Sequence, residues 1–348
     1  MKSFFGLLCG AILFNALSSF GWDYSGHRIV NQVALASLPT NFPGFVRTPA
    51  AQERIAFLAG EADRWRNTTE LPTKHFNAPD HFLDVDDLDL YGLKANSLSY
   101  FRYEFVGQLA VARAASPKNF PPIDEAKNED KTRMLIGLLP WTLTEYYGKL
   151  KSAFSYLKTF EDNGGTPEEI ANARQNIIYL MGVMGHFAGD AAQPLHTTKH
   201  YNGWIGENPK NYATNKTFHS WVDGGYINRA EINFTEMQSR IRPARILSAT
   251  SPNAKSSDIF PTVMAFILDQ HKLVEPIYKL NQDGSLSDRG EGETSKGRAF
   301  ITKQLLAGGQ FLGDLWISAW QSAPTDTYLK SQLAKRKLAE SALTPPKP

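Results

Sequence analysis

Residues 166–184 carry the best-defined helix start and helical pattern in the chain. Thr166 suits the N-cap, Pro167 suits the first helical position because it has no N–H to leave unpaired, and Glu169 completes a capping box. Apolar residues then follow at helical spacing, namely Ile170, Ala173, Ile177, Leu180, Met181 and Met184. The sequence therefore predicts an amphipathic helix over residues 167–190.

Similar apolar faces recur along the chain, and almost no segment alternates as a β-strand does. They lie at residues 26–38, 50–66, 99–115, 131–160, 257–280 and 298–322. No 20–50-residue repeat and no Pro/Gly-rich linker divides the chain. We expect a mainly α, single-domain multi-helix bundle over residues 22–343, with a mobile loop at 281–298 and a Pro-rich tail at 344–348.

The first 21 residues have the pattern of a secretory signal peptide. Lys2 precedes an apolar run over residues 4–17, which is short for a membrane span. Residues 19–21, with Ser19 and Gly21, fit the small-residue cleavage site of a signal peptide. We expect a secreted or periplasmic protein, cleaved before Trp22, with no membrane span. The only cysteine, Cys9, lies in this segment, so disulfides cannot stabilise the cleaved chain, whereas bound metal can.

The charges of the chain are nearly balanced. The 37 Lys and Arg residues against 35 Asp and Glu residues give a net charge of +2. This excludes a histone-like protein that coats polyanions through a large positive excess. No long apolar heptad indicates association, so we expect a monomer.

Histidine and aspartate concentrate between residues 186 and 223. His186 and Asp190 are four residues apart, as are His219 and Asp223, so each pair shares one face of a helix. His196 lies between the pairs, after Pro194, which we expect to end the first helix. Imidazole nitrogen and carboxylate oxygen suit zinc, although each pair alone also fits a surface hydrogen bond. The remaining histidines that fit no ligand pattern are His75, His200 and His271.

Three segments together resemble the S-one/P-one nucleases, which are secreted, single-strand-preferring zinc nucleases. The segments are WDYSGHR (22–28), HFAGDAAQPLH (186–196) and HSWVD (219–223). The resemblance covers nearly the whole chain after residue 21. It implies nine ligands for three zinc ions, namely Trp22, His27, Asp63, His81, His186, Asp190, His196, His219 and Asp223.

The resemblance also implies how these ligands divide. Asp63, His81 and His186 would hold one zinc ion, and Asp190 would bridge to a second, which also takes His27 and the amine and carbonyl of Trp22. The third zinc ion would be held by His196, His219 and Asp223. Because the Trp22 amine is locked in a peptide bond until cleavage, the precursor is expected to be inactive or to lack one zinc ion.

The implied activity is hydrolysis of RNA and single-stranded DNA to 5′-phosphate products, with 3′-nucleotidase activity on nucleotides. Asp86 matches the family's water-orienting aspartate, although the acid-rich stretch at 84–90 also fits a solvated loop. Three aromatic residues, Tyr201, Trp204 and Tyr212, with Lys199 nearby, are interpreted as a rim that stacks unpaired bases. Aromatic residues are, however, more often part of a packed core than of a binding platform.

Several departures from the family pattern leave the substrate open. Gly206-Glu207-Asn208 replaces a usual Gly-Gly-Asn run, and Trp221-Val222 exchanges the usual order before the last aspartate. A zinc-dependent phospholipase C is the alternative enzyme, although the spacing from Trp22 to His27 and the final Asp223 favour the nuclease. A non-catalytic secreted protein that binds zinc or nucleic acid is the alternative of another class.

Overall fold

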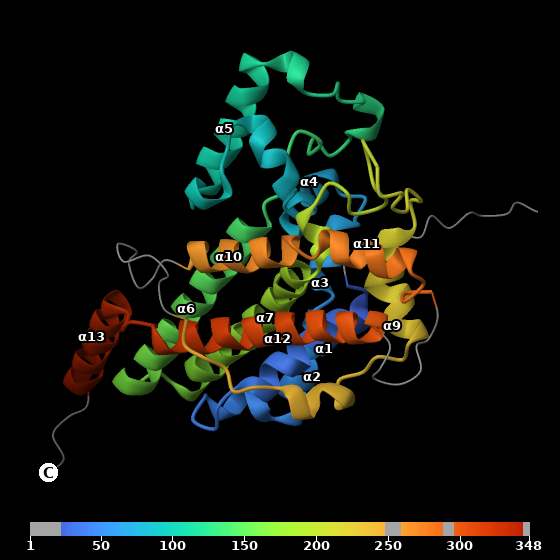
Figure 1. Ribbon diagram of the computed structural model, residues 1–348. Coiled ribbons are helices and arrows are strands. Elements are labelled where there is room, and N and C mark those ends of the chain that lie inside the picture. Colours follow the sequence, from blue (N-terminus) through green and yellow to red (C-terminus); the bar gives the residue numbers. More distant parts are fainter. Residues whose placement is uncertain (1–21, 248–258, 288–295, 344–348) are drawn as a thin grey trace, which may run out of the picture.

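The computed structural model describes residues 22–247, 259–287 and 296–343, and these residues form helices joined by turns (Figure 1). The described part contains no β-strand, and one isolated bridge joins Leu83 to Gly137. The expected mainly α helix bundle is therefore confirmed. The α-helices are α1 (Tyr24–Ser37), α2 (Pro49–Leu58), α3 (Glu61–Arg66), α4 (Leu71–Asn77), α5 (Arg102–Ala115), α6 (Leu139–Asn163), α7 (Pro167–Ala192), α8 (Phe218–Ser220), α9 (Tyr226–Arg229), α10 (Phe260–His271), α11 (Val274–Gln282), α12 (Lys296–Gln321) and α13 (Thr327–Leu343).

Helix α7 begins and ends as its sequence predicts. The Thr166 hydroxyl accepts from the Glu169 amide at 3.2 Å, and the Glu169 carboxylate accepts from the Thr166 amide at 2.8 Å. At the other end Gln193 is extended, and Pro194 follows it. Because Pro194 lacks an N–H, the helix stops there and the chain turns toward His196.

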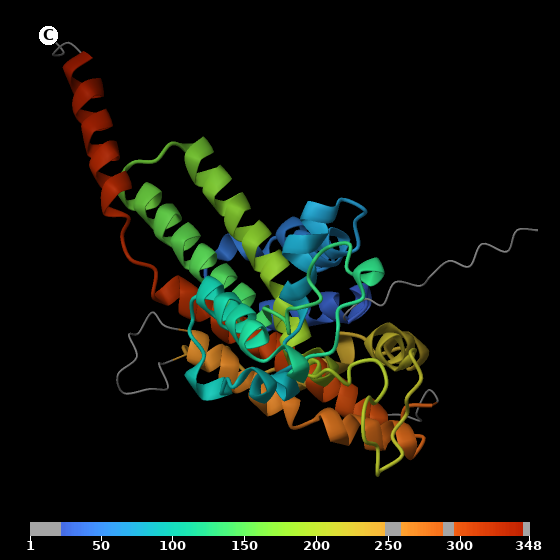
Figure 2. The same ribbon diagram turned by 90° about the horizontal axis from the view of Figure 1, so that it is seen from above.

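The centre of the bundle is a pair of long helices crossed by a third. A left-handed Gly164 ends α6 and lets the chain reverse into α7, so the two helices run side by side (Figure 2). Helix α12 packs on both of them and along α1 (Figure 1). The buried apolar side chains form one cluster that extends from Trp22 to Leu333. The last turns of α7 lie inside this cluster, buried on every side.

Helix α13 extends away from the body and contacts α6 (Figure 2). Arg336 attaches it to the start of α7 by donating to the Glu169 carboxylate at 2.8 Å. Its Leu333 side chain is buried, whereas most of the helix is exposed.

Several boundaries differ from those expected. The stretch 50–66 is two helices, which separate at Ala59 and Gly60, and 257–280 is divided at Lys272 and Leu273. Pro276 explains the second break, because a proline ring collides with the carbonyl four residues earlier in a continuous helix. Residues 131–138 are not helical, since α6 begins only at Leu139.

The loop expected at 281–298 is shorter than predicted. Asn281 and Gln282 end α11, and Lys296 already begins α12. The rest of that loop between 288 and 295 lies outside the described residues, as do the signal peptide expected at 1–21 and the tail at 344–348.

Candidate metal centre

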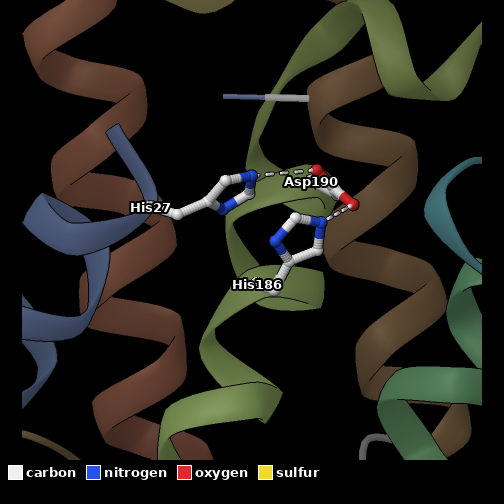
Figure 3. Close-up of side chains that lie close together, drawn as sticks. All are labelled: His27, His186 and Asp190. Atoms are coloured by element: carbon white, nitrogen blue, oxygen red, sulfur yellow. Dashed lines mark ion pairs between the residues drawn. The ribbon is translucent and has the colours of Figure 1, made fainter. Parts of the chain in front are cut away.

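His186 and Asp190 lie on one face of the buried end of α7 and organise the site (Figure 3). His186 Nδ1 donates to the Ala59 carbonyl at 2.7 Å, which fixes the ring and turns Nε2 toward Asp190 Oδ2, 3.3 Å away. A ring held in this way by a backbone carbonyl presents its other nitrogen as a metal ligand.

The first group of possible metal ligands is Asp63, His81 and His186. Asp63 comes from α3, and His81 comes from a 3-10 turn over Ala78–His81. The His81 Nδ1 atom lies 3.0 Å from His186 Nε2 and 4.0 Å from Asp63 Oδ1. One donor atom from each residue lies within 4.8 Å of the others, so the group could hold one metal ion.

The second group is His27, His186 and Asp190. His27 Nε2 on α1 lies 3.5 Å from Asp190 Oδ1, and its ring stacks on the His186 ring with centroids 3.9 Å apart (Figure 3). Trp22 is fully buried beside this group, with its indole Nε1 donating to the Gly189 carbonyl at 2.8 Å. His186 and Asp190 therefore stand between the first and second groups.

The third group is His196, His219 and Asp223. His196 Nδ1 donates to the His81 carbonyl at 2.6 Å, and the Nε2 atoms of His196 and His219 are 3.2 Å apart. Asp223 Oδ2 is 3.1 Å from His219 Nδ1, and its Oδ1 accepts from Gln193 at 2.5 Å. The chain carries His219 in α8 and Asp223 in a π-helical turn over Trp221–Gly225, where a regular α-helix was expected.

Six buried atoms of these groups have no hydrogen-bond partner within the described part of the chain. An unpaired buried polar atom costs about 1–3 kcal/mol, so folded proteins rarely leave several together. Bound metal ions would satisfy the carboxylate oxygens and one nitrogen of each histidine ring, and the His/Asp donor set suits zinc. They are His27 Nδ1, His27 Nε2, Asp63 Oδ1, His81 Nε2, Asp190 Oδ1 and Asp223 Oδ2.

Burial sets the protonation of these groups. It lowers the pKa of His27, His81 and His219, with a further lowering of His219 by nearby His196. These imidazoles are therefore neutral at pH 7 and keep a lone pair for a metal ion. Burial raises the pKa of Asp63 and Asp223, so these carboxyl groups hold their protons to higher pH than usual.

Asp190 behaves differently from the other two carboxylates. Burial works to raise its pKa, but the charges of His196 and His186 and the hydrogen bonds from His186 and His81 outweigh it and hold the pKa well below the usual value. For His186 burial is likewise outweighed, here by Asp190 and Asp63, and the pKa is raised. Asp190 is thus held as an anion among these histidines, as a bridging carboxylate would be.

A cavity of about 700 Å³ opens beside the third group. His196, His219 and Tyr201 form part of its lining. The lining also contains four cationic residues and three carboxylates, namely Arg66, Lys74, Lys127, Arg133, Asp84, Glu129 and Asp130. A volume of this size lies within the range of roughly 300–1,000 Å³ that is typical of ligand sites.

Asp86 lies next to the cavity rather than in its lining. Its Oδ2 atom accepts from the Thr198 hydroxyl at 2.5 Å and from the Lys199 amide at 3.1 Å, while Oδ1 is 3.5 Å from His271 Nε2. Asp86 therefore fixes the turn that follows His196. Among the acidic residues of this stretch, Asp84 lines the cavity.

The four residues expected to bind bases take different positions. Tyr201 is 45% exposed, and its ring meets the His219 ring edge-on at 5.4 Å, so it remains available for stacking. Trp204 stacks on His200, with ring centroids 4.0 Å apart, and Tyr212 is buried against Tyr278. The prediction that Tyr212 belongs to a base-stacking rim is therefore wrong, because an aromatic ring that packs in the core cannot also receive a base. Lys199 donates to Asp87 at 2.7 Å.

The histidines without a ligand pattern lie outside all three groups. His75 is exposed, His200 packs on Trp204, and His271 contacts Thr197 and Asp86. Sequence reasoning missed the residues that orient the ligands, above all Gln193. Its position directly after α7 is the one signal that could have marked it.

A comparison with models of known protein families and with curated proteins gives no match. Within the described residues, no helix is both long and apolar enough to cross a bilayer.

Proposed function

We propose that this protein is a zinc-dependent nuclease that hydrolyses phosphodiester bonds of RNA and single-stranded DNA to 5′-phosphate products. The observation that carries the proposal is the convergence of eight buried His and Asp residues on three adjacent groups, one of which opens into a cavity lined by cationic and acidic side chains. We propose zinc in each group, with the amine and carbonyl of Trp22 completing the second. The resemblance to the S-one/P-one nucleases supports the same assignment.

Zinc held by these residues supplies Lewis acidity toward phosphoryl oxygens and lowers the pKa of bound water. The chain itself supplies position and charge. His186 and Asp190 fix the spacing of the first two groups, and Asp86 holds the turn after His196 against the third. Tyr201 offers an exposed ring beside His219, where an unpaired base could stack but a base within a duplex could not.

The residues of the cavity favour a phosphodiester of nucleic acid over a lipid. Its lining is mostly charged or polar, whereas a lipid chain would need an apolar channel. Phospholipase C activity is therefore the second outcome of the test. We further propose that the chain is exported and is cleaved before Trp22, because only a free Trp22 amine can bind metal. We also propose that it acts as a monomer.

The test is hydrolysis of single-stranded DNA, RNA, duplex DNA and phosphatidylcholine by the cleaved protein, with and without a chelator. We expect chelator-sensitive cleavage of the two single-stranded substrates, and each cut should leave one 5′-phosphate. Hydrolysis of phosphatidylcholine alone would leave the metal groups in place and replace the nuclease by a phospholipase C.

A further inference from the structure

Among the described residues, two of the four cations that line the cavity are paired with carboxylates, and the other two, Lys74 and Arg133, are not. Lys127 pairs with Asp124 at 2.8 Å, and Arg66 lies 3.4 Å from Asp63. In the part of the chain that the structure describes, no carboxylate lies within ion-pair distance of Lys74 or Arg133. No carboxylate of the described residues therefore neutralises these two side chains, and both can pair with an anionic ligand in the cavity.

The segments that carry these two cations are tied together. His75, the neighbour of Lys74 on α4, donates from Nδ1 to the Asp130 carbonyl at 2.7 Å. Arg133 in turn donates from Nε to the Lys127 carbonyl at 2.9 Å, which leaves its terminal nitrogens for other partners. Lys74 and Arg133 thus belong to one wall, built from α4 and residues 126–135.

One carboxylate of this wall, Asp130, is engaged locally. Asp130 Oδ1 accepts from the Thr132 hydroxyl at 3.0 Å and from the Thr132 amide at 3.3 Å. Asp84 and Glu129 also line the cavity, so it does not attract anions over its whole surface. The cavity therefore favours an anion at two places, at Lys74 and Arg133 and at the metal groups. The acidic residues of the lining disfavour an anion elsewhere.

We propose that Lys74 and Arg133 bind a second phosphate of a single-stranded nucleic acid whose scissile phosphate lies at the three His/Asp groups. This inference rests on the proposed function. The cavity is larger than one phosphate requires, and its lining extends from Lys74 and Arg133 to His196 and His219 of the third group. Arg133 can hold two phosphate oxygens at once, and Lys74 adds a point charge. The site would favour chains over dinucleotides, which carry one phosphate only.

The test compares the wild type with Lys74→Ala/Arg133→Ala on two substrates, dodecathymidylate and the dinucleotide TpT. We expect kcat/KM to fall about tenfold more for the dodecamer than for TpT, the usual size for losing charge-assisted hydrogen bonds. Lys335→Ala/Arg240→Ala is the matched control, since both residues are exposed and neither lines the cavity. Equal losses on both substrates would overturn the inference.

A binding measurement separates this inference from the proposed function. Fluorescence anisotropy of a labelled phosphorothioate dodecathymidylate follows binding without cleavage. The logarithm of affinity should fall with the logarithm of salt concentration, with a slope smaller by about 0.7 for each phosphate contact that the double variant loses. A weaker complex in the double variant of a protein that cleaves no nucleic acid would keep the subsite and reject the nuclease. Unchanged binding in a protein that does cleave would reject the subsite.

Discussion

Gly189 on α7 lies directly against His27 on α1, and a Cβ atom added to Gly189 would stand 2.6 Å from His27 Nδ1. This separation is too short for two non-bonded atoms. The absence of a side chain at position 189 is thus what lets α1 bring His27 to Asp190. The ligand geometry of the second group depends on how closely two helices pack.

Gly189→Ala is therefore expected to displace His27 and to weaken metal binding at the second group. Elemental analysis should show about one metal ion fewer per chain, while the other groups stay loaded. Gly148→Ala on α6 is the matched control, because a Cβ there meets nothing within 4 Å. The control should be neutral or more stable by up to about 1 kcal/mol, since alanine favours a helix. Full metal content in Gly189→Ala would show that the second group does not depend on the close packing of α7 against His27.

His186→Ala is expected to abolish hydrolysis and to remove metal from the first group. Because His186 Nδ1 donates to the Ala59 carbonyl, Nε2 is its one free ligand atom, and its ring also packs on His27 of the second group. Its loss should therefore remove at least one metal ion per chain. The exposed His75 provides the control substitution, His75→Ala. An active His186→Ala variant with full metal content would refute the assignment.

Asp86→Ala is expected to keep the metal and to slow turnover. Asp86 accepts two hydrogen bonds from the turn after His196 but belongs to none of the three groups. Its loss should loosen that turn and lower kcat roughly 10–100-fold, the range for partners that orient a metal ligand. Unchanged kcat with native metal content would remove Asp86 from the mechanism.

Metal affinity is expected to fall as the pH is lowered. A metal ion binds the deprotonated carboxylates of Asp63 and Asp223, whose pKa values burial raises in the metal-free protein. Protons therefore compete with the metal, by up to about tenfold per pH unit for each proton released. Chelator competition at several pH values measures this slope, and Asp223→Asn should make it shallower. An affinity that does not change with pH would contradict the protonation described for these groups.

The sequence predicted the parts of the fold that local chemistry decides. The capping box at Thr166 and the end of α7 at Pro194 follow from single residues, and the structure contains both. The division of 257–280 into two helices was not predicted, although Pro276 is the residue in the sequence that indicates it. The late start of α6 was not predictable from periodicity, because residues 131–138 are held by contacts with residues distant in sequence, such as the bridge from Gly137 to Leu83.

The candidate site was predicted better in composition than in shape. All eight His and Asp residues named from the sequence occur in the three groups. The π-helical turn at Asp223 was not predicted, because four-residue spacing fits an α-helix equally well. The burial of Tyr212 was also missed, since an aromatic residue looks the same in sequence whether it packs in the core or faces solvent.

The most direct test of a metal-dependent nuclease is metal content measured together with activity on protein that begins at Trp22. We expect three zinc ions per chain by elemental analysis and cleavage of single-stranded DNA that is lost on metal removal and restored by zinc. A folded protein that binds no divalent metal, or one that cleaves single-stranded DNA equally well without it, would contradict the account.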